Sequence, residues 1–251
     1  MSTSQINSEQ PVVLITGGAK RIGKHIALFL HDCGYSIMVH YRSSANSAFQ
    51  LVDELNSKRE NSAASVQGDL TDTDTVHFIV EQTIEQFGKL NVLINNASTF
   101  YPTPIELLEI DYWNDLIGSN LRGPAFLIKS AAPHLRESQG NIINIVDIYA
   151  TRPLSNHPVY CSAKAGLQML TKSLARDLAP EIRVNGIAPG AVLWPEAGNS
   201  EIDQETLIAT IPLGHMGAPE DIAKTIRFLI EEGTYITGQI IAVDGGRSVT
   251  I

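Results

Sequence analysis

The sequence predicts a doubly wound α/β fold: a single domain with a seven-stranded parallel sheet and helices on both faces. Short β-branched or apolar runs alternate along the chain with longer helical patterns. The first of these runs leads directly into a glycine-rich turn, Gly17–Gly23, that opens the first helical pattern. Strict alternation of strand and helix predicts parallel strands joined by right-handed helical crossovers, with ligands at the carboxyl ends of the strands.

The strands are predicted from short runs rich in Val, Ile and Ala that are flanked by turn residues. These runs are Val12–Thr16, Ser36–His40, Ala64–Val66, Val92–Ile94, Ile142–Val146, Val184–Ala188 and Ile240–Val243.

The helices are predicted from apolar residues that recur with helical spacing. These stretches are Ile22–Cys33, Ser47–Arg59, Thr73–Phe87, Tyr112–Arg136, Val159–Leu178 and Glu220–Ile230. Gly34 and Gly88 follow two of them and are typical helix stops. Gly123-Pro124 is expected to break the fourth stretch, leaving Asp111–Ser119 and Ala125–Arg136 as its more regular parts.

The domain is expected to cover residues 11–251, preceded by a flexible and polar N-terminus over residues 1–10. Residues 190–210 contain Pro195, Gly198, Asn199 and Ser200 with little periodicity at first, which predicts a mobile loop followed by a short helix. We expect this loop to lie near the substrate.

The composition excludes several classes of function. The 251 residues carry a formal net charge of -9 and 43% hydrophobic residues, which predicts a globular protein and argues against nucleic acid or an anionic membrane as partner. The two cysteines, Cys33 and Cys161, suggest neither a disulfide framework nor a metal site. A secretory signal and long apolar runs are missing from the pattern, so we expect a cytoplasmic protein.

The glycine-rich turn predicts a dinucleotide site. Gly17 and Gly23 allow the backbone to approach a pyrophosphate, and the helix that begins near Ile22 supplies unpaired N–H groups and the positive end of its dipole. Lys20 and Arg21 add positive charge. Such turns also occur for packing reasons, which is the alternative.

The end of the second strand favours NADPH over NADH. Many dinucleotide sites place an acidic residue here to bind the ribose hydroxyls, but the segment from His40 through Tyr41 to Arg42 and Ser43 has none. Arg42 and Ser43 are therefore expected to hold a 2′-phosphate, helped by the basic residues of the first turn. The alternative is a solvated arginine and a helix-capping serine, with His40 packing at the strand end.

Two further strand ends are expected to face the cofactor. Asp69-Leu70 ends the third strand, where Asp69 either accepts a hydrogen bond from the adenine amino group or starts the next helix. The segment Asn96–Ser98, through Ala97, ends the fourth strand with small residues and carboxamides that allow close approach of backbone to cofactor. Asn95 is expected to bridge strands.

Tyr160 and Lys164 are the candidate acid–base pair. They lie four residues apart on a predicted helix and therefore project from one face. A neighbouring ammonium favours the phenolate and brings the tyrosine pKa closer to the useful range. Taken alone, the pair is also typical of an ordinary amphipathic helix.

Together, several motifs resemble those of the short-chain dehydrogenase/reductase family over essentially the full length. They are "TGGAKRIG", "NNAS", "SNLRG", "YCSAK" and "RVNGIAPG". The resemblance implies that Tyr160 is the proton donor and that Lys164 binds the nicotinamide ribose and lowers the tyrosine pKa. It also implies that Asn120 holds a water of the proton relay and that Pro189 and Gly190 border the cofactor.

One position departs from the family. A serine usually stands thirteen residues before the tyrosine, and here Asp147 stands there. Aspartate at this position, with "NNASTFYPTP" and "HYRSS", resembles the pteridine reductases within the family. A role for Asp147 in capping the following turn is the alternative.

That subgroup resemblance implies further substrate contacts. Phe100 would stack a pterin ring against the nicotinamide, although it also fits a loop anchor in the core. Ser98 would hydrogen-bond substrate or cofactor phosphate, and Arg21 would contact both cofactor phosphate and pterin. Trp194 is expected in the substrate loop, or at an exposed loop tip or subunit contact, and His157 is interpreted as part of a turn.

The sequence thus favours an NADPH-dependent reductase of pterins, including dihydrofolate or oxidised pterins as candidate substrates. Asp147, if burial raises its pKa, can hold the proton that a C=N reduction requires, which serine cannot do. The alternatives are a carbonyl reductase of 3-oxoacyl thioesters or sugars, and a non-catalytic dinucleotide sensor. The resemblance also implies a homotetramer.

Overall fold

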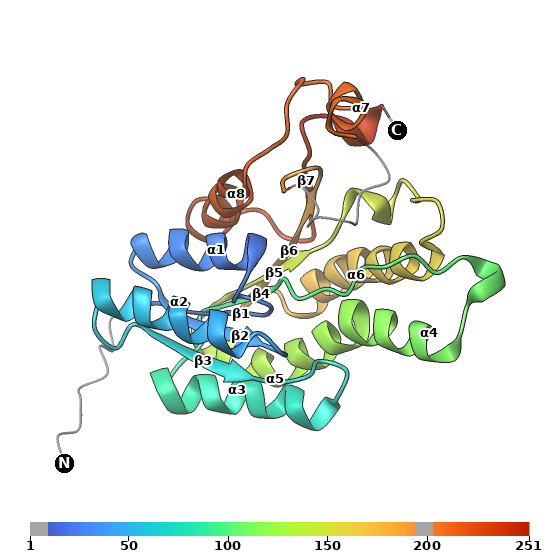
Figure 1. The fold of residues 1–251 in the computed structure, drawn as a ribbon. Helices are drawn as coiled ribbons and strands as arrows, with labels where there is room; N and C mark the ends of the chain where they lie inside the picture. Colours follow the sequence, from blue (N-terminus) through green and yellow to red (C-terminus); the bar gives the residue numbers. More distant parts are fainter. Residues whose placement is uncertain (1–9, 194–202, 251) are drawn as a thin grey trace, which may run out of the picture.

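The computed structural model describes residues 10–193 and 203–250 of the chain. Its centre is a seven-stranded sheet with strand order β3-β2-β1-β4-β5-β6-β7, in which all neighbouring strands are parallel (Figure 1). The predicted fold class is confirmed. The strands are β1 (Val12–Ile15), β2 (Ser36–Tyr41), β3 (Ala63–Gln67), β4 (Val92–Asn95), β5 (Asn141–Ile145), β6 (Arg183–Pro189) and β7 (Ile240–Val243).

Helices cover both faces of the sheet. They are α1 (Arg21–Asp32), α2 (Ala45–Lys58), α3 (Thr73–Phe87), α4 (Ile110–Ile117), α5 (Gly123–Glu137), α6 (Pro158–Asp177), α7 (Gln204–Ala209) and α8 (Pro219–Glu231). Gly88 caps α3 with φ +75°, and Gly34 follows α1 with φ +100°, so the two predicted helix stops are confirmed.

Two hydrophobic layers hold the helices to the sheet. Side chains from α1, α2 and α8, such as Ile26, Leu51 and Ile226, pack on one face with the strands, while α3, α5 and α6 cover the other (Figure 1). Strands β1, β2, β4 and β5 are buried along their whole length, which explains their continuous apolar sequences. Burying one such Leu or Ile fully contributes about 1.5–3 kcal/mol.

The predicted break in the fourth helical stretch takes the form of a π turn. Helix α4 ends at Ile117, residues Gly118–Arg122 form the π turn, and α5 begins at Gly123 with Pro124 in its first turn. Proline is tolerated there because a first-turn N–H has no partner within the helix. The regular part predicted to extend to Ser119 is therefore shorter, because the chain widens into the π turn two residues earlier.

The short helix expected after residue 190 is α7, capped by Asp203, whose side chain accepts a hydrogen bond from the Thr206 N–H. The expectations for the N-terminal segment 1–9 and for Trp194 and Pro195 lie outside the described residues. Within residues 10–193 and 203–250, the chain offers no helix that is long and apolar enough to cross a membrane.

The strand order determines where a ligand can bind. Strand β1 lies between β2 and β4: the chain runs outward from β1 through β2 to β3 and then crosses back to β4 on the other side of β1, where the direction reverses. A crevice forms at the carboxyl edge where such a reversal occurs, and ligands of doubly wound sheets bind there. The glycine turn, Arg42, Ser98 and Asp147 all follow the carboxyl ends of strands at this edge.

Candidate active site

Asp147 and Tyr160 form a direct hydrogen bond. Asp147 follows β5 in extended backbone conformation, and Tyr160 lies in the first turn of α6. The Tyr160 hydroxyl donates to Asp147 Oδ2 at 2.7 Å, and the backbone N–H of Tyr149 donates to Asp147 Oδ1 at 2.9 Å. The carboxylate thus both caps the turn that follows β5 and contacts the tyrosine, so the two interpretations of Asp147 are compatible.

The protonation of this pair follows from burial. Burial raises the pKa of the Asp147 carboxyl, against the opposing effects of its hydrogen bonds and of Lys164 and Arg247. Burial and then the negative charge of Asp147 raise the pKa of Tyr160 well above its usual value. This direction is opposite to the one expected from Lys164, because burial and the adjoining carboxylate outweigh the effect of the lysine on the tyrosine pKa. The phenol keeps its proton at neutral pH and donates a hydrogen bond to Asp147.

Lys164 is buried one helical turn beyond Tyr160 on α6. Its ammonium donates to the backbone carbonyl of Ile145 at 2.9 Å and lies 5.8 Å from the centre of the Tyr160 ring. Burial lowers the pKa of Lys164 to about 8, while Asp147 opposes this shift. The predicted pair is therefore brought together with Asp147 in one buried cluster.

Asn120 and Ser98 adjoin this cluster. The fully buried Asn120 lies in the π turn, and its amide donates to the carbonyls of Leu116 (2.9 Å) and Thr99 (3.0 Å). Its Oδ1 accepts a hydrogen bond from the Ser98 hydroxyl at 2.7 Å. The Ser98 hydroxyl also acts on Tyr160, whose pKa it lowers against the larger effect of burial. π turns often occur at functional sites, and this one aims Asn120 at the end of β4.

Phe100 lies next to the tyrosine and is 54% exposed. It stacks on the ring of His157, with centres 4.7 Å apart and planes 13° apart, and meets the Tyr160 ring edge-on at 4.8 Å. The His157 Nδ1–H donates to the carbonyl of Ser155 at 2.7 Å, which orients that ring. This arrangement forms an aromatic wall beside the tyrosine hydroxyl.

The glycine turn fits a pyrophosphate. A Cβ on Gly23 would lie 2.3 Å from the carbonyl oxygen of Gly17 and 2.6 Å from Asn96 Nδ2, so only glycine permits this close packing. Helix α1 begins at Arg21, and its N-cap residue Lys20 makes no side-chain cap, which leaves the first-turn N–H groups for an anion. Lys20 and Arg21 are exposed there, and Ile22 is half-buried.

A buried polar residue, His40, supports the glycine turn. The N–H of Gly17 donates to His40 Nδ1 at 3.2 Å, and His40 Nε2 lies 3.1 Å from the carbonyl oxygen of Gly68. The ring is therefore neutral with its proton on Nε2, and burial lowers the pKa of His40 to about 4. His40 and Tyr41, both predicted to contact the cofactor, are buried, and His40 supports the turn.

The end of β4 is tied to the same turn. The amide of Asn96 donates to the carbonyl oxygens of Thr16 (2.9 Å) and Gly17 (3.1 Å), and the Ala97 N–H donates to Thr16 Oγ1 at 3.0 Å. Asn95 bridges β4 and β5 through a 2.8 Å hydrogen bond to Asn144, as expected.

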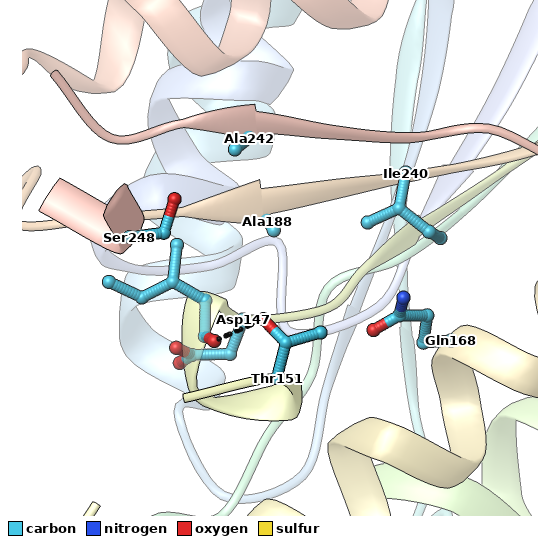
Figure 2. Close-up of a pocket in the computed structure, with 8 residues that line it drawn as sticks. Asp147, Thr151, Gln168, Ala188, Ile240, Ala242 and Ser248 are labelled. Carbon is cyan, nitrogen blue, oxygen red and sulfur yellow. Dashed lines mark hydrogen bonds between the residues drawn. The ribbon is translucent and has the colours of Figure 1, made fainter. Parts of the chain in front are cut away.

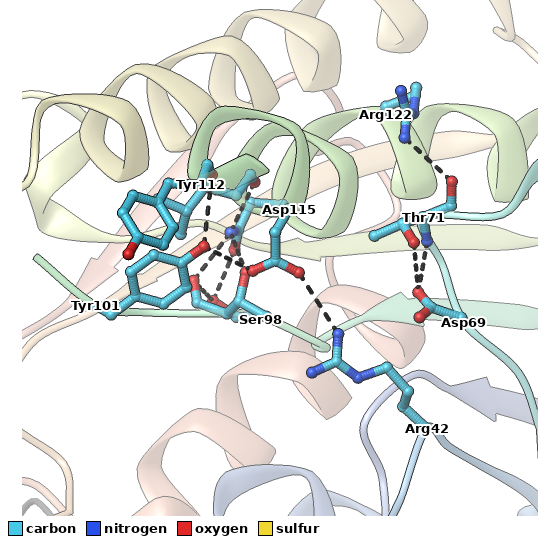
Figure 3. A network of polar contacts seen from close by, with 11 residues as sticks. Arg42, Asp69, Thr71, Ser98, Tyr101, Tyr112, Asp115 and Arg122 are labelled. Atoms are coloured by element: carbon cyan, nitrogen blue, oxygen red, sulfur yellow. Dashed lines mark hydrogen bonds and ion pairs between the residues drawn. The ribbon is translucent and has the colours of Figure 1, made fainter. Parts of the chain in front are cut away.

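At the other end of the crevice, Arg42 and Ser43 are exposed after β2. Figure 3 shows Arg42 directed toward Asp115 of α4, with 3.6 Å between the charged atoms. Asp69 accepts two hydrogen bonds from Thr71, at 2.9 Å from its N–H and 2.8 Å from its hydroxyl. Asp72 caps α3, so the helix-start interpretation of Asp69 is wrong.

The remaining predicted residues that the structure describes lie at the same edge of the sheet. Leu70 is buried beside Asp69, and Pro189 ends β6. The Gly190 N–H donates to the carbonyl of Val243 at 3.0 Å. Trp194 lies outside the described residues.

A cavity of about 140 Å³ is lined in part by Asp147 (Figure 2). Its lining comes from the turn after β5, from α6, from β6 and β7 and from the C-terminal turn: Asp147, Ile148, Thr151, Gln168, Ala188, Ile240, Ala242 and Ser248. Asp147 thus borders this cavity as well as contacting the Tyr160 hydroxyl.

Sequence patterns did not identify three residues of this region. Asp115 and Tyr101 form the contacts around Arg42, and the Tyr101 hydroxyl donates to Asp115 at 2.9 Å. Arg247 lies 5.6 Å from the centre of the Tyr149 ring, and its charge lowers the pKa of Asp147. Tyr101 stands in "NNASTFYPTP", but neither it nor the other two was singled out, because each meets its partner only through folding. Among the described residues, no group of three His, Cys, Asp or Glu side chains could hold a metal ion.

Comparison with known proteins decides the family. A family model described as enoyl-(acyl carrier protein) reductase matches residues 17–248, which span the glycine turn, Asp147, Tyr160 and Lys164. The chain belongs to the short-chain dehydrogenase/reductase family. It is therefore an oxidoreductase, and family members of this type use NAD(P)H.

Relatives of this short-chain dehydrogenase/reductase include enzymes with different substrates. It is 36% identical to pteridine reductase 1 of Leishmania tarentolae over 96% of this chain and 97% of the relative. It is 37% identical to the 3-oxoacyl-(acyl-carrier-protein) reductase FabG of Staphylococcus aureus strain Mu50 over 93% of this chain and 96% of the relative. FabG of Staphylococcus epidermidis strain RP62A is 35% identical over 93% of this chain and 97% of the relative. These identities are too similar to assign the substrate.

Proposed function

We propose that this enzyme reduces pterins with NADPH, taking dihydropterin to tetrahydropterin, and that dihydrofolate and oxidised pterins are further substrates. The observation that carries the proposal is the 2.7 Å hydrogen bond from the Tyr160 hydroxyl to Asp147. Reduction of a C=N bond adds hydride to carbon and a proton to nitrogen. A carboxyl group beside the phenol gives the site a second group that can hold that proton.

In this mechanism the protein residues supply and position the proton. Bound NADPH supplies the hydride. The Tyr160 hydroxyl gives its proton to the ring nitrogen, and protonated Asp147, whose pKa burial raises, replaces it. The Lys164 ammonium stabilises the negative charge that develops on the phenol oxygen. Water in the cavity beside Asp147 then returns a proton to the carboxyl group.

The aromatic wall supports a flat substrate. The Phe100 ring is fixed by His157 on one side and by the edge of Tyr160, yet it keeps half of its surface exposed. A planar, nitrogen-rich ring gains dispersion and stacking energy against such a surface. In this proposal Phe100 holds the pterin against the nicotinamide, Ser98 and Arg21 contact its polar edge, and Asn120 holds a water of the proton relay.

For the cofactor, Arg42 and Ser43 are proposed to bind the 2′-phosphate of NADPH. Both are exposed after β2, and Lys20 and Arg21 lie at the start of α1. A guanidinium group forms charge-assisted hydrogen bonds with phosphate oxygens.

The second candidate function is NADPH-dependent reduction of 3-oxoacyl thioesters, which the 37% identity to FabG favours.

Steady-state kinetics with NADPH and dihydrobiopterin, dihydrofolate or an acetoacetyl thioester test these proposals. We expect the highest kcat/KM with dihydrobiopterin. Asp147→Ser should lower kcat for the pterin by about 10²–10³-fold, the usual size of an acid–base contribution, with little change in the Kd of NADPH. Asp111→Ser, which removes an exposed carboxylate from α4, serves as control and should leave kcat unchanged.

Faster turnover of the thioester, with Asp147→Ser as active as wild type, would establish the 3-oxoacyl alternative instead. Binding of NADPH without turnover of any of the three substrates would favour the sensor interpretation.

A further inference from the structure

A carboxylate from another part of the chain lies beside the arginine proposed to bind the 2′-phosphate. Asp115 of α4 approaches Arg42 with 3.6 Å between Oδ1 and the guanidinium nitrogen (Figure 3). The segment directly after β2 contains no acid, and the carboxylate that meets Arg42 comes from α4. The site therefore combines an arginine that attracts phosphate with a carboxylate that repels it.

A second residue fixes the carboxylate in this position. The Tyr101 hydroxyl donates to Asp115 Oδ2 at 2.9 Å, while Oδ1 faces Arg42. Burial and the nearby Asp115 raise the pKa of Tyr101 to about 12, so the hydroxyl remains a donor at neutral pH. One oxygen of Asp115 thus accepts a hydrogen bond from the neutral Tyr101 hydroxyl, and the other pairs with Arg42, which a ligand can displace.

The ion pair is exposed enough to be displaced. The Arg42 side chain is 51% exposed and the Asp115 side chain 32% exposed. An ion pair in such contact with water is weak, since water solvates both charges well. A phosphate group, which carries close to two negative charges, can therefore take Arg42 away from Asp115, but it then lies next to an uncompensated carboxylate.

We propose that Asp115 is a cofactor-specificity residue that reduces the preference of this site for a phosphorylated ribose. The proposal rests on the assignment of Arg42 to the 2′-phosphate. Repulsion from Asp115 weakens the binding of NADPH. NADH is not repelled, because its 2′-hydroxyl is neutral and can donate a hydrogen bond to a carboxylate.

Equilibrium binding of NADPH and NADH, followed by nucleotide fluorescence, tests the proposal. Asp115→Asn keeps the size and the hydrogen bond from Tyr101 but removes the charge. The ratio of the NADH Kd to the NADPH Kd should rise by about two- to fivefold, the range expected for one exposed charge pair. Asp115→Glu, which retains the charge, should keep the ratio near that of wild type.

Asp111→Asn controls for net charge, because it removes an exposed carboxylate from the same helix and should leave the ratio unchanged. The fragments adenosine 2′,5′-bisphosphate and 5′-AMP, measured by calorimetry, should reproduce the shift without the nicotinamide end. An unchanged or lower ratio in Asp115→Asn would overturn the proposal and show that Asp115 only positions Arg42.

Arg42→Met separates this proposal from the proposed cofactor preference. If Arg42→Met leaves the Kd of NADPH unchanged, the assignment of Arg42 itself fails. If Arg42→Met weakens NADPH binding while Asp115→Asn does not raise the ratio, only the role of Asp115 fails.

Discussion

At the residue scale, both polar atoms of the Asp147 carboxyl group and of the His40 ring have hydrogen-bond partners, and these partners fix each side chain. Asp147 uses one oxygen for the Tyr149 N–H and the other for the Tyr160 hydroxyl, so the carboxyl group cannot turn toward solvent without losing both. His40 likewise uses both ring nitrogens inside the protein. Each group is fixed in orientation because every polar atom it buries has a partner.

His40 makes the stability of the fold depend on pH. Its pKa is about 4 in the folded protein against an ordinary value of 6.5, so between these values the unfolded chain binds a proton that the folded protein does not. The free energy of unfolding should therefore fall as the pH decreases from 6.5 toward 4, with a slope from this residue approaching about 1.4 kcal/mol per pH unit.

Urea unfolding at several pH values between 7 and 4.5 measures this dependence. His40→Gln should show a shallower dependence than wild type, although other groups still titrate. One of them is His31, whose pKa burial also lowers to about 4, and it is present in both proteins. Identical slopes would contradict the buried, neutral state of His40.

At the element scale, short irregular segments determine where the site residues lie. The π turn Gly118–Arg122 aims Asn120 at Thr99, and the glycine turn brings α1 close to the end of β4. The periodicity of the helices and strands predicted their positions well, since their side-chain pattern is local. The form of the break before Gly123 was not predictable, because a π turn has no sequence pattern of its own.

Gly23→Ala tests the glycine turn as an element. The new Cβ would lie 2.3 Å from the Gly17 carbonyl oxygen, so we expect a loss of stability of about 1–3 kcal/mol and a Kd of NADPH at least tenfold weaker. Thermal unfolding and fluorescence titration measure the two effects.

Gly217→Ala is the matched control, because its added Cβ meets nothing nearer than 3.5 Å and should change neither quantity. NADPH binding of Gly23→Ala equal to that of wild type would show that the cofactor does not need this close approach.

At the scale of the whole molecule, large apolar side chains remain exposed on α4, α5 and α6. Trp113, Phe126 and Met169 are 43%, 40% and 64% exposed. Apolar area of this kind is typical of surfaces that other subunits cover. We propose that these helices pair between subunits in the homotetramer that the family resemblance implies.

Sedimentation equilibrium measures the assembly directly. We expect a mass of four chains of 27.3 kDa each for the wild type. Phe126→Glu combined with Met169→Glu should give smaller species, because two charges would be buried without partners. Phe78→Glu on α3, where the phenylalanine is 46% exposed, should keep the mass of the wild type. A monomeric wild type would contradict the proposal.

The sequence by itself determined the doubly wound sheet, the positions of most strands and helices to within about two residues, and the family, since periodicity and motif spacing are properties of neighbouring residues. It also singled out Asp147, because the spacing to Tyr160 is a count along the chain.

Only the tertiary structure decided which distant groups meet and how strongly burial acts on them. The approach of Asp115 to Arg42 and the stacking of Phe100 on His157 join separate elements. The raised pKa of Tyr160 reflects burial and the nearness of a carboxylate, which outweigh the lysine one turn away. Distances across the fold and exclusion of water arise from packing, and local sequence does not encode them.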